Sequence, residues 1–333
     1  MLPRNRRYVA AAWLCAFLFA GPQALAQPVE RVGVRALGMA GAFVAVADDA
    51  SAAYWNPASL NGGNFFGFTL DYVRQPVPRG DSLAVPQGPL ASETWLGAVV
   101  TPPLGLSFYR LEAWGRDRRA DRGGIGIPVA RLSTSHIGVT VLQSLTDRIT
   151  VGTTVKLVRG RAGSGQISTA TSGDALRDAA AALGTSASSA VDLDVGVRAD
   201  AGFLRFGLLA RNVLRPSFDT PEGDTLGLDR QIRLGVAVVP SESWTVSADA
   251  DLLRTESFEG RNRGVAIGLE RWLADRRFAL RGGVRFRTLD DAEPIAALGA
   301  GVALRTGLFL DVHANAASDD REGGFGLSAR LVF

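Results

Sequence analysis

The chain has 333 residues, 47% of them hydrophobic, and carries 36 basic against 33 acidic side chains. Three of the basic residues, Arg4, Arg6 and Arg7, lie at the very start. Without them the basic count falls from 36 to 33 and equals the acidic count. A balanced charge gives no electrostatic support for binding nucleic acid, so no nucleic-acid partner is expected.

Residues 1–26 are predicted to be a secretory signal peptide. The arginines are followed by an apolar run over residues 8–20 and then by the small-residue site Ala24-Leu25-Ala26, which is the usual order in such peptides. Cys15, the only cysteine, lies in the apolar run without the small residues of a lipoprotein cleavage site before it. The mature chain is therefore expected to begin at Gln27 and to hold no thiol or disulfide.

Residues 27–62 contain a stretch of small side chains, RALGMAGAFVAVADDASAAYWNPASL, which starts at Arg35. Such residues bury little apolar area, but Gly and Ala let a backbone fit into a confined space. Asp48 is expected to cap a short helical turn, and Asn56 is forced out of the helical region by Pro57. One interpretation is a surface loop with a short helix, and the other is a segment enclosed by the rest of the fold.

From residue 63 to the C-terminus the sequence predicts an all-β domain. Apolar and polar residues alternate with the period of two that strands require, most clearly from Phe325 to Phe333. No stretch after residue 26 approaches the roughly 18–20 apolar residues of a membrane helix. About fourteen strands are expected, at 63–73, 92–101, 104–114, 133–143, 148–160, 189–199, 202–213, 230–240, 243–254, 262–272, 276–287, 294–305, 307–315 and 323–333.

The connections between these strands fall into two alternating classes. Tight turns such as Pro102-Pro103 alternate with longer links such as 161–188, a pattern typical of an outer-membrane β-barrel and not of a soluble sandwich. Within that link, the sequence from Asp174 to Gly184 predicts a small amphipathic helix at the outer mouth. A disordered, low-complexity insert is the alternative.

The chemistry of the mature chain gives little support for an enzyme. It keeps only two histidines, His136 and His313, and it lacks a nucleophile elbow, a zinc-ligand cluster and a phosphate-binding loop. No catalytic residue, metal or cofactor is therefore predicted. Charges of both signs are instead expected to face the barrel lumen, which suits either a water-filled porin or a plugged barrel; they include Asp249, Asp251, Glu270, Arg277 and Arg281.

The stretch GMAGAFVAVADDASAAYWNPASL resembles the N-terminal signature of the FadL-type outer-membrane transporter superfamily, and most of all its PorV/PorQ and TraF-like branch. The resemblance implies a fourteen-stranded antiparallel transmembrane β-barrel in the bacterial outer membrane, formed by residues 63–333, with residues 27–62 as a small hatch in its lumen. The hatch residues would be Gly38, Met39, Gly41, Asp48, Asp49, Asn56, Pro57 and Ala58.

The function implied by the resemblance is passive uptake of small hydrophobic molecules. The alternative is a PorV-like barrel that serves protein secretion or binds a protein partner, and a purely structural barrel is a third possibility. The expected partners are outer-membrane lipid and either a hydrophobic small-molecule ligand or a secretion-system protein.

A kink in the third strand opens a lateral gate in FadL-type proteins. Here the apolar phase jumps between Phe108 and Tyr109, as a β-bulge would make it do. Phe108, Tyr109 and Arg110 are therefore the candidate lateral gate, expected to face the Asn56-Pro57-Ala58 corner. The alternative is that the strand ends at Arg110.

Overall fold

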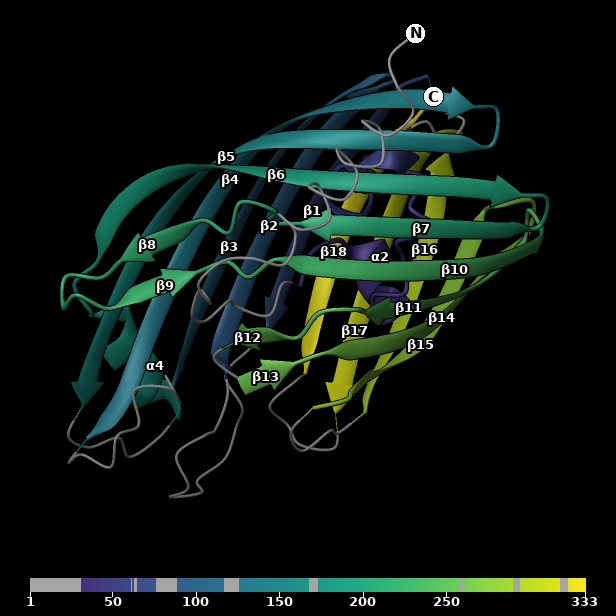
Figure 1. The fold of residues 1–333 in the computed structure, drawn as a ribbon. Helices are drawn as coiled ribbons and strands as arrows, with labels where there is room; N and C mark the ends of the chain where they lie inside the picture. Colours follow the sequence, from purple (N-terminus) through teal and green to yellow (C-terminus); the bar gives the residue numbers. More distant parts are fainter. Residues whose placement is uncertain are drawn as a thin grey trace, which may run out of the picture.

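The structure is a computed structural model that describes residues 31–60, 62, 65–75, 89–116, 126–167, 173–257, 260–289, 294–317 and 323–333. Fourteen strands form a closed antiparallel barrel in which the first strand, β1, pairs with the last, β18 (Figure 1). The predicted fold class is confirmed. The predicted signal peptide, residues 1–26, lies outside the described residues.

The barrel strands follow one another around the wall in chain order. Their bounds are β1 Gly67–Gln75, β2 Pro89–Thr101, β3 Leu104–Arg116, β4 Ile127–Thr146, β5 Ile149–Ile167, β6 Ser186–Ala201, β7 Leu204–Arg211, β10 Gln231–Ser241, β11 Trp244–Asp251, β14 Gly264–Leu273, β15 Phe278–Arg287, β16 Ile295–Arg305, β17 Leu308–Ala317 and β18 Gly324–Val332. Each matches one predicted strand, but β4 and β5 reach 20 and 19 residues, well beyond the predicted 133–143 and 148–160. Within the described ranges, no helix is long and apolar enough to cross a membrane.

The two faces of the wall differ in their side chains as the alternation predicts. On β15, Leu280 is 54% exposed on the outward face, whereas the neighbouring Ala279 is 1% exposed on the inward face. Val246 on β11 and Leu327 on β18 are exposed in the same way. An exposed apolar band carried by strand after strand is typical of a wall that faces lipid.

Residues 31–60, here called the N-terminal segment, lie inside the barrel. The segment forms two short helices, α2 (Val34–Gly38) and α3 (Ala52–Trp55), and the 3-10 turn η1 (Pro57–Ser59). Every residue of it is buried except Leu37 and Asp48, which are partly buried. Because the segment is enclosed by the wall, the interpretation as a surface loop is wrong.

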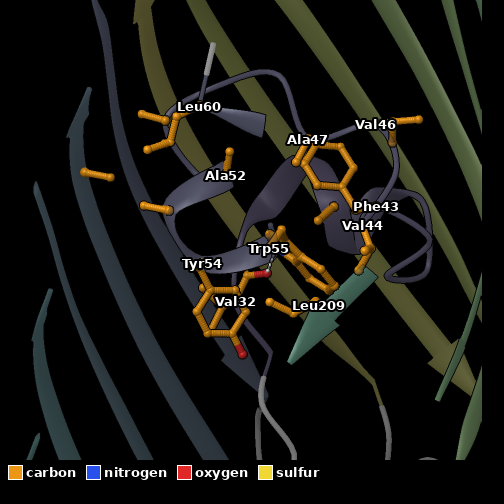
Figure 2. Packing of buried hydrophobic residues seen from close by; sticks show 14 of the residues in the cluster. Val32, Phe43, Val44, Val46, Ala47, Ala52, Tyr54, Trp55, Leu60 and Leu209 are labelled. Atoms are coloured by element: carbon orange, nitrogen blue, oxygen red, sulfur yellow. Dashed lines mark hydrogen bonds between the residues drawn. The ribbon is translucent and has the colours of Figure 1, made fainter. Parts of the chain in front are cut away.

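The largest hydrophobic cluster of the described residues lies between this segment and the wall (Figure 2). Phe43 and Tyr54 both meet the Trp55 ring edge-on, with centroids 6.0 and 5.7 Å apart. The wall adds inward side chains such as Leu96 and Leu209. The small residues of the segment could not form a core alone, but together with these wall side chains they do. The barrel therefore has a packed core at this level.

Two of the long links add structure at the outer ends of the strands. The hairpin of β8 (Ser217–Asp219) and β9 (Thr225–Gly227) packs Phe218 and Leu226 against inward residues of β3, β4 and β5, so it covers the mouth. A second small hairpin joins β12 (Thr255–Ser257) to β13 (Gly260–Asn262).

The predicted helix is present as α4 (Gly173–Ala181). It packs Leu176 and Ala180 against Val129 and Trp114. The side chains of Val129 and Trp114 lie on the outward face of β4 and β3, as their alternation with the inward Ala130 and Ala113 shows. The helix therefore lies outside the wall beside the mouth.

Candidate functional site

Glycines of the wall let the backbone of the N-terminal segment approach closely. At six inward positions a Cβ would collide with that segment: Gly152, Gly196, Gly207, Gly235, Gly268 and Gly283, on β5, β6, β7, β10, β14 and β15. At Gly299 on β16 a Cβ would be in tight contact with it. At Gly268, for example, a Cβ would lie 2.6 Å from the Met39 carbonyl oxygen, closer than real Cβ contacts allow. The wall is thus shaped to its occupant over half of its circumference.

The residues predicted for the first part of the hatch lie at the end of α2. The Gly38 Cα lies 3.0 Å from the place of a Cβ on Gly299, and the Met39 backbone faces Gly268 and Gly283. Gly41 has a φ of 84°, in the region that favours glycine, and its N–H donates to Ala36 O at 2.9 Å. These residues set the helix end directly on the barrel wall.

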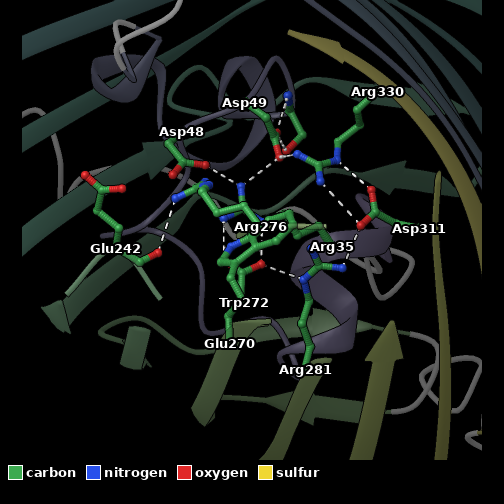
Figure 3. A network of polar contacts seen from close by, with 11 residues as sticks. Arg35, Asp48, Asp49, Glu242, Glu270, Trp272, Arg276, Arg281, Asp311 and Arg330 are labelled. Carbon is green, nitrogen blue, oxygen red and sulfur yellow. Dashed lines mark hydrogen bonds and ion pairs between the residues drawn. The ribbon is translucent and has the colours of Figure 1, made fainter. Parts of the chain in front are cut away.

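Six charged side chains form a closed ring of ion pairs that joins the segment to β14, β15, β17 and β18 (Figure 3). Three are arginines and three are carboxylates, and all six are buried. In order around the ring they are Asp49, Arg35, Glu270, Arg281, Asp311 and Arg330. Successive nitrogen–oxygen distances in this order are 3.1, 2.7, 2.6, 2.7, 2.6 and 3.3 Å.

The two adjacent aspartates of the segment have different surroundings. Asp49 belongs to the ring and also accepts a hydrogen bond from the Ser51 backbone N–H at 2.9 Å. Burial alone would raise the pKa of Asp49, but Arg330 and Arg35 outweigh it and lower that pKa below its usual value. Asp48 pairs with Arg35 from a partly exposed position, and it is not a helix cap, because α3 begins only at Ala52.

The charges predicted to face the lumen do so with one exception. Asp249 accepts hydrogen bonds from the backbone N–H groups of Phe43 and Val44 at 2.8 and 2.9 Å, and Asp251 pairs with Arg233 at 2.7 Å. Glu270 and Arg281 lie in the ring.

Arg277 does not face the lumen. It lies exposed in the turn over residues 274–277, just before β15 begins. Arg277 continues the alternation of the inward residues Ala279 and Arg281, but it lies beyond the end of the strand. The prediction for it was therefore wrong.

The Asn56-Pro57-Ala58 corner is fixed against β5 and β6. The Asn56 amide donates to Val44 O and Val197 O at 2.9 and 3.1 Å, and its oxygen accepts from the Ala58 N–H at 3.1 Å. The Thr150 hydroxyl donates to Ala58 O at 2.7 Å. The corner thus faces β5 and β6 and not the third strand.

The predicted break at Phe108 to Arg110 is absent. The pairing of β3 with both β2 and β4 runs through these residues without a register shift. Phe108 and Arg110 point outward, whereas Tyr109 points inward and meets the Tyr54 ring at 5.3 Å. The apolar residues of β3 change from the outward face, up to Phe108, to the inward face, from Tyr109, because the N-terminal segment covers the inward face there. The strand has no bulge at this point, so the bulge prediction was wrong.

A second buried ionic cluster lies beside this contact and was not predicted. The Lys156 ammonium pairs with Asp192 and Asp194 at 3.0 and 2.8 Å and donates to the Tyr109 hydroxyl at 3.2 Å. His136 stacks on the Tyr109 ring with centroids 4.1 Å apart. The alternation of β6 indicates that both aspartates face inward, but nothing local indicates that Lys156 lies opposite them.

Comparison with solved structures shows that FadL- and TodX-type proteins have a similar fold. The Pseudomonas aeruginosa FadL homologue aligns with a TM-score of 0.63 at 13% identity, covering 93% of this chain and 99% of that one. The P. putida toluene transporter TodX aligns at 0.61 and 13%, and the Ralstonia pickettii toluene transporter TbuX at 0.59 and 14%, each covering 92% of this chain and 99% of the other. Two of these proteins are named as transporters and not as enzymes, which agrees with the prediction that this chain is not an enzyme.

Sequence comparison gives a narrower result. Residues 129–251 match the family model described as the F plasmid transfer operon TraF protein. No protein of curated function matches the sequence. The PorV/PorQ branch is not supported by these matches. The chain therefore has the fold of the FadL and TodX transporters, as its N-terminal signature indicated.

Proposed function

We propose that the protein is an outer-membrane channel for the passive uptake of small hydrophobic molecules, with residues 31–60 as its hatch. The observation that carries the proposal is the N-terminal segment seated in a closed fourteen-stranded barrel. The likeness in fold to the toluene transporters supports the hydrophobic class of substrate. The outward apolar band supports a place in a membrane.

The packing of the lumen argues against an open porin. The segment fills the barrel with an apolar cluster on the side of β2 and β3 and with ion pairs on the side of β14 to β18. An open porin instead leaves an aqueous channel along its axis. A molecule can pass this level only when the segment shifts against the wall, so we assign it the role of a hatch that moves.

The alternative, a PorV-like role in protein secretion, rests on the resemblance of the signature alone. The family match over residues 129–251 covers β4 to β11 and does not include the N-terminal segment. We therefore favour uptake.

The test is entry of labelled toluene into cells of an outer-membrane channel-deficient strain that express this chain, compared with entry of arabinose. We expect faster toluene entry than in cells without the chain, and unchanged arabinose entry, since the lumen is filled. Unchanged toluene entry with a correctly folded barrel in the outer membrane would refute the proposal. Arabinose entry equal to that of an open porin would refute the closed hatch.

A further inference from the structure

Four arginines gather on the outward face of three neighbouring strands, just beyond the apolar band. Cross-strand pairing places Arg110, Ser135 and Arg159 in one row, and Glu112, Ser133 and Arg161 in the next. Arg131 follows one step further, paired with Trp114. Strand β3 begins at Leu104, directly after the tight Pro102-Pro103 turn, and ends at Arg116, where the long link to β4 begins. These rows lie towards Arg116, so they are at the end of the barrel that carries the long links.

The row on the other side of the arginines is purely apolar. It consists of Phe108, Ile137 and Leu157, which face each other across β3, β4 and β5 and are all exposed. On the opposite side of the barrel the outward apolar positions reach Val265, Phe286, Ala296 and Ala314, and the exposed Arg263 follows two residues beyond Val265. The β3–β5 patch differs because its four arginines stand within the strands, so it borders directly on the surface expected to touch acyl chains.

The cations of the patch exceed the anion within it. Glu112 is the one carboxylate among these residues, and it pairs with Arg131 at 2.6 Å and with Arg110 at 3.2 Å. Arg159 and Arg161 are exposed, and no hydrogen bond or ion pair ties their side chains to the described part of the chain. Four guanidiniums against one carboxylate leave a surface that calls for an anionic partner.

We propose that this face of β3, β4 and β5 binds an outer-leaflet glycolipid that carries two phosphate groups. Its acyl chains would lie on the apolar row, and its phosphates would meet the guanidiniums one step above. Arg110 and Arg159 lie two strands apart, about 10 Å, so two phosphates of one headgroup can each find a guanidinium. Helix α4, whose Ala181 O accepts from Arg131 at 2.9 Å, borders the site on its outer side.

This inference rests on the proposed outer-membrane location with the long links outside, but not on uptake. The probe is diphosphorylated lipid A, added to the folded barrel in detergent and measured by native mass spectrometry. We expect Arg159→Ala/Arg161→Ala to weaken binding about 10- to 30-fold. The matched control, Arg148→Ala/Arg305→Ala, removes two exposed arginines at the tight-turn end and should leave binding unchanged.

Two further arms separate the phosphate from other causes. Lipid A stripped of phosphate should bind weakly and equally to the wild type and to the double variant, and inorganic pyrophosphate should bind far more weakly than the lipid. Equal binding of lipid A to both double variants, or undiminished binding of the stripped lipid, would overturn the proposal. Arg159→Lys/Arg161→Lys serves if the alanine variant fails to fold, with a smaller loss expected because the charge remains.

The same variants separate this inference from the proposed function. The double alanine variant should take up toluene like the wild type, because both side chains point away from the lumen. Absent toluene entry with normal lipid binding would count against uptake alone.

Discussion

Replacing Arg281 by methionine should break the ring of six buried ion pairs and strongly destabilise the protein. Arg281 lies between Glu270 and Asp311, at 2.6 and 2.7 Å, with no exposure of its side chain. Methionine fills much of the same volume but leaves three buried carboxylates against two guanidiniums. Removing one partner of a buried ion pair costs about 3–5 kcal/mol. With urea dependence of ~2 kcal/mol per molar, the unfolding midpoint should fall by about 1.5–2.5 M.

The assay is a urea titration of the folded barrel, read by heat-modifiable gel mobility. Arg205→Met is the matched control, because Arg205 pairs with Asp200 at 3.6 Å in a solvated position and its loss should cost less than about 1 kcal/mol. Adding Glu270→Gln to Arg281→Met restores the charge balance and should recover part of the loss. If Arg281→Met lowers the urea unfolding midpoint no more than Arg205→Met does, the ring of ion pairs does not stabilise the N-terminal segment in the barrel.

Three further predictions concern the wall, its lipid face and acid. Gly283→Ala should make residues 31–60 accessible to protease, since its Cβ would lie 2.7 Å from their backbone, whereas the outward Gly282→Ala, with 3.8 Å to its nearest neighbour, should not. Ile267→Arg, in the middle of β14, should cost about 2–4 kcal/mol in lipid, and Leu304→Arg, next to a turn, about 0–1 kcal/mol, as measured by urea unfolding in liposomes. Because the pKa of Asp49 is lowered in the folded state, its contribution is complete above its unfolded pKa of about 3.9 and is lost as the pH falls further. Protease protection of the segment should therefore hold from pH 7 to about pH 4; loss at pH 6 would contradict this assignment.

The wall was predictable because alternation is a local property of each strand. Neighbouring residues of a strand point to opposite faces, so the sequence alone assigned Leu280 to the outside and Ala279 to the inside. The same reasoning failed where both faces are covered. On β3 the segment covers Tyr109, and on β4 helix α4 covers Val129 while the β8–β9 hairpin covers Ala130, so polarity no longer reports direction there.

The ring was not predictable because its members are distant in the sequence. Alternation indicated that Glu270 and Arg281 face inward, but Arg35 is 235 residues before Glu270. Which charges meet depends on the stagger of the strands around the barrel and on the height of the segment inside it. Neither quantity is contained in the pattern of a single strand.

The central claim is that residues 31–60 close the channel and must shift for uptake. The Thr150 hydroxyl donates to Ala58 O at 2.7 Å, so cysteines at these two positions, one on β5 and one on the segment, would lie within reach of a short, reducible thiol cross-linker. In the matched control, Thr140→Cys/Thr154→Cys joins β4 to β5, where the two hydroxyls lie 2.7 Å apart, and leaves the segment unlinked. Toluene entry is measured for both pairs after cross-linking and again after reduction. We predict that cross-linking stops entry in Ala58→Cys/Thr150→Cys and that reduction restores it, with no change in the control; full entry through the cross-linked hatch would contradict the account.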